Sequence, residues 1–201
     1  MKLDTQTRQK QIIETSLEII RSGGIQKLTT KEIARRIGIS EQAVYRHFNS
    51  KLHILTAVIR YFDDCFQELF DSIDLPDEPL HQIKKITSTH LEFFNNNPAV
   101  AAVIFSEEIF QNEKSLSMEV KQALEKRLKH MTSLISAGQH RGEIRNEFAA
   151  DNLAHILLAS MRLIVTRWRL AGFSYDLTKQ GRLIIDDFLS LIEGPDILNE
   201  K

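Results

Sequence analysis

Four residues whose side chains donate hydrogen bonds lie within one short stretch: Tyr45, Arg46, His47 and Lys51. Phenol, guanidinium, imidazole and ammonium groups all bind phosphate oxygens. Contacts of this kind hold a protein on nucleic acid without reading its base sequence. A hydrophobic core does not need such a cluster, so the pattern predicts a phosphate-binding surface on which Tyr45, His47 and Lys51 are the donors.

The residues around this cluster have a second kind of chemistry. Gln42 and Arg46 carry groups that can form paired hydrogen bonds with the edges of adenine and guanine, respectively. Glu41 leaves two interpretations open. Its carboxylate can accept a hydrogen bond from the amino group of cytosine, or it can cap the helix and keep clear of phosphate. The stretch is therefore predicted to combine phosphate contacts with base-edge contacts.

Two short helices are expected to position these side chains. The stretch Thr29-Thr30-Lys31-Glu32 has the form of a capping box and starts the first helix, which Gly38 ends in a close turn. Ser40 then caps a second short helix. Three residues of that helix are expected to face the protein body: Ala43, Val44 and Phe48. This is a helix-turn-helix pattern, in which the second helix can enter a major groove.

The charge of the chain is unevenly distributed. Residues 1–60 contain 11 Lys and Arg against 5 Asp and Glu, a net charge of +6, whereas the whole chain has a net charge of −1. A basic N-terminal segment on an acidic remainder indicates that the first part binds a polyanion and that the rest has another task. Chance unevenness over a short segment is the alternative explanation.

The remainder of the chain is predicted to be helical. Gly and Pro are scarce, with 8 and 4 residues, and they fall at the ends of segments. No long apolar–polar alternation predicts a strand. The expected fold class is therefore all-α. Beyond a first helix near 5–22 and the helix-turn-helix, helices are expected near 51–70, 80–95, 98–111, 115–139, 150–171 and 178–193.

The last two expected helices are unusually apolar. In 153–171 and 182–192 the apolar positions spread beyond a single stripe. A helix that is apolar on more than one face has to be covered on more than one face. A partner subunit or an internal core can supply that cover, and the sequence leaves both open. The side chains expected at a homodimer interface are Leu157, Met161, Ile164, Ile185, Phe188 and Leu189.

Aromatic residues are concentrated in the middle helices. Phe62, Phe66 and Phe70 follow each other at four-residue spacing, which places three rings on one helix face. Core packing accounts for any single ring, whereas the wall of an apolar pocket accounts for the group. The residues expected to line such a pocket are Phe62, Phe66, Phe93, Phe94, Phe105, Ile109, Met131 and Trp168. The bound molecule is expected to be hydrophobic or amphipathic.

Several other classes of function lack their sequence signatures. A single cysteine, Cys65, excludes an intramolecular disulfide and a CxxC metal site. The seven histidines show no metal-ligand spacing, so neither a metal nor a cofactor is expected. The absence of a glycine-rich phosphate loop, GxSxG or HExxH argues against an enzyme. With no apolar signal core and no apolar run near the roughly 20 residues of a membrane span, a cytoplasmic protein without membrane contact is expected.

Taken together, these motifs resemble the DNA-binding domain of TetR-type transcriptional regulators (TetR/AcrR type). The matching segments are RQKQIIETSLEIIRSGG, LTTKEIARRIGIS, the pattern Val44-Tyr45-x-His47-Phe48-x-x-Lys51, and the pair Ile54-Leu55. The resemblance departs at Leu52, where the family often has an acidic residue. The segment GEIRNEFAADNLAHILLASMRLIVTRW resembles, more loosely, the lead into the penultimate helix of such regulators.

The resemblance implies a DNA-binding domain at 1–50 and a helical effector-binding and dimerisation domain at 51–201. It implies phosphate contacts from Thr29 or Thr30, Lys31, Tyr45, His47 and Lys51. It implies base contacts from a helix that Ser40 caps, made by Glu41, Gln42, Ala43 and Arg46. It also implies an effector cavity at roughly 51–171 and a dimer formed by the last two helices.

The expected function is a ligand-responsive repressor that binds a palindromic DNA operator as a homodimer and is released by a small hydrophobic or amphipathic effector. Two alternatives stay open. One is a helical protein–protein adaptor whose basic N-terminal part binds an acidic partner. The other is a DNA-binding regulator without a small-molecule effector, whose cavity is filled by side chains.

Overall fold

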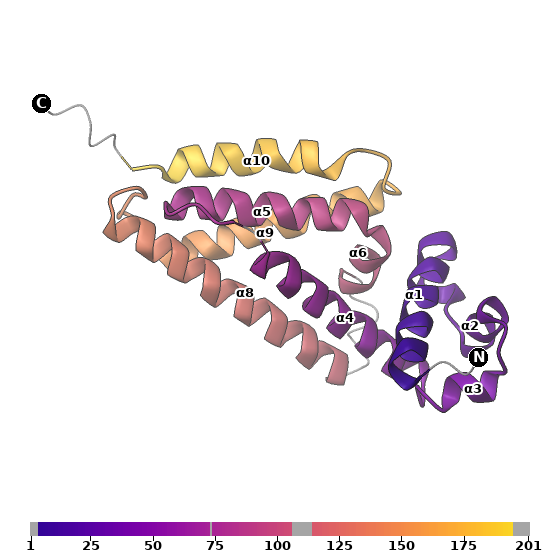
Figure 1. Cartoon of the computed structure of the whole chain (residues 1–201). Coiled ribbons are helices and arrows are strands. Elements are labelled where there is room, and N and C mark those ends of the chain that lie inside the picture. The colour runs from indigo at the N-terminus through magenta and orange to yellow at the C-terminus, as the bar shows by residue number, and fades with distance from the viewer. Residues whose placement is uncertain (1–3, 73, 106–113, 195–201) are drawn as a thin grey trace, which may run out of the picture. The chain divides into compact units, whose positions relative to one another are not determined.

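Scarce glycine and helical periodicity predict an all-α chain, and the computed structural model confirms it over the residues that it describes, 4–72, 74–105 and 114–194 (Figure 1). The helices are α1 (Thr5–Gly23), α2 (Thr30–Ile37), α3 (Glu41–Tyr45), α4 (Lys51–Asp71), α5 (Pro79–Asn96), α6 (Pro98–Ile104), α8 (Lys114–His140), α9 (Ala150–Leu170) and α10 (Leu177–Ile192). A short 3-10 turn, Ile25–Lys27, follows α1. Within these described ranges the only β-type pairing is one isolated bridge between Ile144 and Glu193.

Side-chain caps fix both helices of the helix-turn-helix where the sequence predicts them. The hydroxyl of Thr29 accepts the amide of Glu32 at 3.1 Å and starts α2. Ser40 accepts the amide of Ala43 at 3.1 Å and starts α3. Between the two helices Gly38 has a φ of 77°, in the left-handed region that side chains disfavour, so glycine allows the close turn.

The chain divides into two compact units. Unit 1 consists of residues 1–65 and 97–121, and unit 2 consists of residues 66–96 and 122–201. Unit 1 therefore contains the predicted 1–50 domain together with the first part of α4, α6 and the start of α8. Both α4 and α8 contribute residues to each unit.

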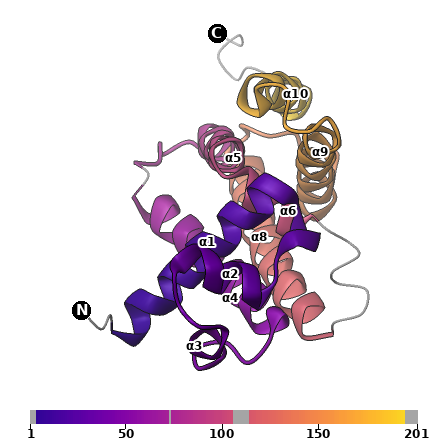
Figure 2. The ribbon, with the colours of Figure 1, turned by 90° about the vertical axis from the view of Figure 1, so that its right-hand side faces the viewer.

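Unit 1 is built around a core that supports the helix-turn-helix. Here α1 packs against α2 and α6, and α2 packs against α3 (Figure 2). The fully buried side chains include Ile12, Ile19, Leu28, Ile33, Val44 and Ile54. Because these come from α1 to α4, burial of apolar surface fixes the short helices α2 and α3, which have too few residues to be stable alone.

In unit 2, α10 packs against α5 and α9. Gly181 permits the approach of α10 to α5, since a Cβ at this position would lie 2.4 Å from Cδ1 of Leu91. An ion pair between Lys84 and Asp186 at 2.8 Å joins the same two helices. The three helices bury most of the apolar residues of 153–192 within a single chain.

Candidate functional site

The short helix α3 has one buried face and one exposed face. Val44 is fully buried and Phe48 is 7% exposed, so both anchor the helix to the core of unit 1. Gln42, Tyr45 and Arg46 are exposed, and the Tyr45 side chain is 46% accessible. A phenol and two groups suited to base edges therefore stand on the surface of a helix that could enter a major groove. Ala43 is half-buried.

The predicted phosphate donors lie on elements around α3. Thr29 and Lys31 are exposed at the start of α2, and His47 is half-buried just after α3. The ammonium of Lys51, at the start of α4, donates to the carbonyl of Ile25 at 3.1 Å. Partial burial lowers the pKa of Lys51. An ammonium has three hydrogens, so this contact leaves donors for a phosphate oxygen.

Thr30 is placed differently from Thr29. Its side chain is only 8% exposed, and its hydroxyl lies 2.5 Å from a carboxylate oxygen of Glu41, to which it donates. The same Oγ1 lies 3.3 Å from the hydroxyl of Tyr45. A hydroxyl has a single hydrogen, so Thr30 has no donor left for phosphate. Of the two threonines, Thr29 is therefore the one available for a phosphate contact.

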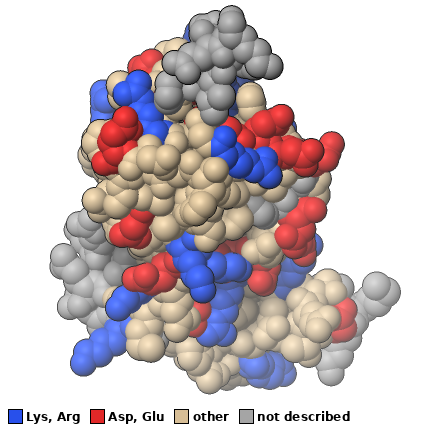
Figure 3. Space-filling view, turned by 90° about the vertical axis from the view of Figure 1, so that its left-hand side faces the viewer, with Lys and Arg blue, Asp and Glu red and all other residues tan. Residues whose placement is uncertain are grey.

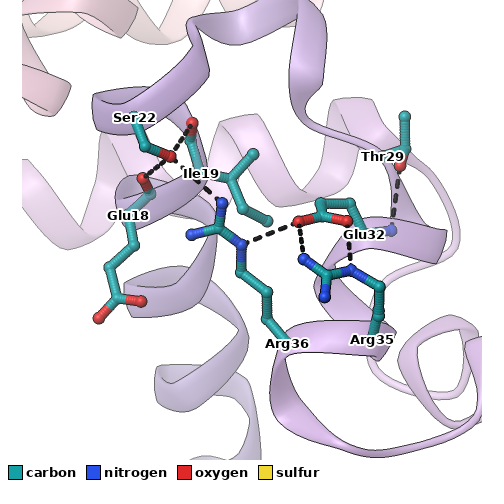
Figure 4. Close-up of polar contacts among 7 residues, drawn as sticks. All are labelled: Glu18, Ile19, Ser22, Thr29, Glu32, Arg35 and Arg36. Atoms are coloured by element: carbon teal, nitrogen blue, oxygen red, sulfur yellow. Dashed lines mark hydrogen bonds and ion pairs between the residues drawn. The ribbon is translucent and has the colours of Figure 1, made fainter.

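A cluster of charges ties α2 to α1 (Figure 4). The carboxylate of Glu32 accepts two hydrogen bonds from Arg35, at 2.8 and 2.7 Å, and one from Arg36 at 2.9 Å. Arg36 also donates to the hydroxyl of Ser22, near the end of α1, at 3.2 Å. Hydrogen bonds from Arg35, and then from Arg36, lower the pKa of Glu32 to about 2, against an ordinary value near 4.5. Two of the basic residues of this segment thus pair within the protein.

Replacement of Glu32 by glutamine is expected to lower the melting temperature at pH 7 and to matter less in acid. A carboxylate whose pKa is lower in the folded state stabilises the fold above its unfolded pKa, and this stabilisation is lost as the pH falls from near 4.5 to about 2. Thermal unfolding of wild type and Glu32→Gln at several pH values measures the difference. Glu14→Gln is the control, since Glu14 has only an exposed pair with Lys10 at 4.0 Å. A difference that does not change with pH would contradict the assignment.

Basic and acidic side chains are mixed on other parts of the surface. On the face shown in Figure 3, Lys and Arg side chains are interspersed with Asp and Glu. A polar groove of about 600 Å³ in unit 2 likewise contains both signs, and ion pairs join Lys84 to Asp186 and Arg182 to Glu92 along it. The candidate nucleic-acid interface is defined by the exposed side chains of α2, α3 and the start of α4.

Three of the aromatic residues predicted for a pocket lie together in unit 2. The ring centroids of Phe66 and Phe93 are 6.2 Å apart, and those of Phe93 and Phe94 are 6.1 Å apart. His90 completes the group, at 4.2 Å from Phe66 and 5.2 Å from Phe94. The guanidinium of Arg127 lies 5.2 Å from the Phe66 ring centroid. These five residues are called the aromatic cluster below.

Burial, and then the charge of Arg127, lowers the pKa of His90 to about 3. The imidazole is therefore neutral near pH 7. Neither His90 nor Arg127 is among the residues predicted from the sequence. The four-residue spacing of His90 and Phe94 on α5 could have indicated the former, but no pattern in the sequence indicates that Arg127, on α8, lies beside them.

The other predicted pocket residues do not lie in the aromatic cluster. Phe62 and Phe105 belong to unit 1, where Phe62 is 2% exposed and Phe105 is half-buried. Trp168 stacks edge-on with Phe173 at 4.7 Å and donates to the carbonyl of Tyr175. Met131 is buried in unit 2, and Ile109 lies outside the described residues.

The side chains predicted for a dimer interface lie at buried positions of α9 and α10. All six are 9% exposed or less within the single chain: Leu157, Met161, Ile164, Ile185, Phe188 and Leu189. They therefore contribute to the core of unit 2, and a contact with a partner subunit stays a prediction. Of the two covers that the sequence leaves open, a partner subunit and an internal core, the single chain shows the internal one for these six side chains.

Other apolar residues of the same helices are exposed. On α9 these are Ile156, Leu163 and Leu170, and on α10 they are Leu183, Ile184 and Leu191. The three residues on α9 are 52%, 60% and 77% accessible and follow one another at seven-residue spacing, which places them on one helix face. This spacing is visible in the sequence and distinguishes the exposed stripe from the buried one.

Two other kinds of site are not present in the described part of the chain. No group of three or more His, Cys, Asp or Glu residues there could hold a metal ion. Among the helices described, none combines the length and the apolar character needed to cross a membrane.

Comparison with known proteins adds family information to this geometry. The family model for "Bacterial regulatory proteins, tetR family" matches residues 12–58, and that for "YsiA-like protein, C-terminal region" matches residues 62–190. Among curated proteins, the chain is 23% identical over 167 residues to Nucleoid occlusion factor SlmA of Shewanella halifaxensis. The matched residues cover 83% of this chain and 82% of that protein.

Solved structures show the same fold. A TetR transcription regulator from Haloarcula marismortui matches with a TM-score of 0.83 at 17% identity, over 94% of this chain and 99% of that one. Transcriptional regulator FadR from Bacillus subtilis, in complex with stearoyl-CoA, matches with a TM-score of 0.73 at 20% identity, over 91% and 98% of the two chains. The family matches extend over both the helix-turn-helix and the helices that follow it. The chain therefore belongs to the TetR family of DNA-binding transcriptional regulators.

Proposed function

We propose that this chain is a repressor that binds a palindromic operator as a homodimer and is released by an amphipathic effector. The observation that carries the proposal is the arrangement of α3. Its Val44 side is buried in the core of unit 1, whereas Gln42 and Arg46 are exposed. A helix held in this way can present two base-contacting groups to a major groove.

The remaining exposed or half-buried donors are assigned to phosphate. These donors lie at the start of α2, on or just after α3 and at the start of α4, and they would fix the register of the protein on DNA: Thr29, Lys31, Tyr45, His47 and Lys51. The resemblance to the family and the exposure of most of these residues support this division. Ser40 contributes as the cap of α3, and Ala43 is small enough to allow a close approach to a base.

The exposed apolar residues of α9 and α10 support a homodimer. Four leucines of these helices are each at least 60% accessible, and Ile156 is 52% accessible: Leu163, Leu170, Leu183 and Leu191. Large exposed apolar patches mark interaction surfaces in soluble proteins. We assign the dimer interface to this stripe, which pairs with its own copy in a two-fold arrangement.

The aromatic cluster supports an effector with an apolar part and an acidic group. Phe66, Phe93 and Phe94 offer aromatic surface, and the guanidinium of Arg127 beside them offers a partner for a carboxylate or phosphate. FadR of Bacillus subtilis, which shares the fold, has been solved with stearoyl-CoA, a molecule that combines both features. An acyl-CoA thioester or a fatty acid is therefore the class of effector to test first.

A continuous helix provides a route for coupling. Helix α4 begins at Lys51, beside the proposed DNA surface, and continues to Phe66 in the aromatic cluster. An effector releases DNA only to the extent that it binds the DNA-incompetent state more tightly than the competent one. Displacement of Phe66 by the effector would be transmitted to the start of the same helix.

Stearoyl-CoA is expected to dissociate the wild-type protein from DNA, and Phe93→Ala is expected to weaken this response by about tenfold or more. Loss of a half-buried ring removes roughly 2 kcal/mol of apolar contact. The measurement is fluorescence anisotropy of a labelled duplex titrated with stearoyl-CoA. Leu124→Ala is the matched control, because Leu124 is an exposed apolar residue of α8 outside the cluster. Equal responses of both variants would contradict the assignment of the effector site.

The similarity to a nucleoid occlusion factor favours a second candidate, in which the DNA-bound protein acts in nucleoid occlusion. A chromosome-wide map of bound sites separates the two. A repressor is expected to bind a few promoters whose transcripts rise when the gene is deleted. Many sites away from promoters, with no change in neighbouring transcripts, would support the second candidate.

A further inference from the structure

We infer that Glu41 is a positioning residue that locks the recognition helix α3 onto α2, and that it does not contact a base. This inference rests on the proposed role of α3 in DNA binding. Glu41 is the residue whose role the sequence leaves open, since a carboxylate beside a phosphate backbone is unfavourable. The structure offers it a partner inside the protein.

The contact that joins α2 to α3 here is a single hydrogen bond between two side chains. The hydroxyl of Thr30, in the first turn of α2, lies 2.5 Å from a carboxylate oxygen of Glu41, the first residue of α3. Thr30 is 8% exposed, so water competes little for its hydroxyl, whereas the side chain of Glu41 is exposed. A hydrogen bond to a carboxylate is stronger than one between neutral groups. The bond therefore fixes the start of α3 against α2.

The same atom also orients Tyr45. The hydroxyl of Tyr45 lies 3.3 Å from Oγ1 of Thr30. Because the single hydrogen of Thr30 is given to Glu41, the contact with Tyr45 requires the phenol to be the donor. At 3.3 Å this bond is long, so Tyr45 can exchange it for a phosphate oxygen while the bond between Thr30 and Glu41 persists.

Helical spacing then divides α3 into two working faces. Glu41 and Tyr45 are four residues apart and lie on the face that meets Thr30. Gln42 and Arg46 form the adjacent four-residue pair, which is exposed. The first pair fixes the angle of the helix, and the second pair is free to contact bases. The buried side chain of Val44 also anchors α3, and the bond between Glu41 and Thr30 adds a contact at its first residue.

Loss of either partner is expected to have the same consequence. Thr30→Val keeps the shape of the side chain but removes the hydroxyl, and Glu41→Ala removes the acceptor. Each is expected to weaken binding by roughly tenfold, and the double variant by the same tenfold rather than a hundredfold, because both remove one shared bond. Thr30→Ser and Glu41→Gln keep a donor and an acceptor, respectively, and are expected to bind within about threefold of wild type.

The probe is the duplex that the wild-type full-length protein enriches from a random-sequence pool, together with its single-base variants. Affinities are measured by anisotropy, and circular dichroism and melting temperature confirm that each variant is folded. The inference predicts a non-additive double variant and an unchanged order of preference among the base variants. Additive losses, or an altered preference at one base pair in Glu41→Ala but not in Thr30→Val, would overturn it. If the wild type enriches no duplex, the proposed function fails instead.

Discussion

Replacing Leu163 with aspartate is expected to convert the proposed homodimer into monomers and to weaken binding to a two-half-site operator by on the order of 10²- to 10⁴-fold. Leu163 is 60% accessible and is the middle residue of the exposed stripe on α9. A carboxylate at the centre of an apolar interface loses its hydration when the two subunits associate. It also repels the same carboxylate of the partner subunit across the two-fold axis. Once the subunits separate, each half-site is bound independently and the gain from linking them is lost.

Sedimentation equilibrium measures the oligomeric state, and anisotropy measures affinity for duplexes with one and two half-sites. Leu124→Asp is the matched control, because Leu124 is 46% accessible on α8 and lies outside the stripe. The variant Leu163→Asp should bind the two duplexes nearly alike, whereas the control should retain the preference for two half-sites. A dimer that persists in Leu163→Asp at micromolar concentration would exclude this stripe as the interface.

The second large effect is a change of sequence preference in Gln42→Ala. An amide that forms paired hydrogen bonds with adenine is worth about 1–3 kcal/mol of discrimination against the wrong base, or a factor of roughly 10 to 100 at one base pair. The exposed position of Gln42 on α3 makes it the first candidate for such a contact. Selection from random duplexes with the variant should therefore give a site that has lost its preference at a single position in each half.

Tyr45→Phe and Lys51→Ala are expected to behave differently. Both weaken binding to all sequences alike, since phosphate contacts carry no base information. Lys51→Ala should also lower the slope of log affinity against log salt by about 1, because one fewer phosphate is neutralised. Tyr45→Phe keeps the ring and removes only the hydroxyl, so its salt slope should stay unchanged. Equal losses of sequence preference in all three variants would refute the division between base and phosphate contacts.

The local signals of the helix-turn-helix could be read from the sequence because each has a short-range physical cause. The hydroxyl caps at Thr29 and Ser40 and the left-handed turn at Gly38 depend on residues within a few positions of one another. The burial of Val44 and Phe48 follows from helical periodicity. The all-α fold class and the family resemblance rest on the same short-range patterns, and the structure and the family matches confirm both.

Contacts between distant segments could not be predicted in the same way. The pairing of Glu41 with Thr30 requires the angle between α2 and α3, and the proximity of Arg127 to Phe66 requires the packing of α8 on α4 within unit 2. On α9 and α10, apolar residues on both faces allow either face to be the buried one. The packing of α10 against α5 and α9 decides it, and this buries Leu157 and leaves Leu163 exposed.

Selection of bound duplexes from a random-sequence pool, with the wild-type protein at two salt concentrations, tests the central claim most directly. A dimeric DNA-binding regulator predicts enrichment of an inverted repeat with two similar half-sites, and affinity for it should fall steeply with salt. A helical adaptor for an acidic protein partner would enrich no common sequence. Failure to enrich any motif at either salt concentration would contradict the account.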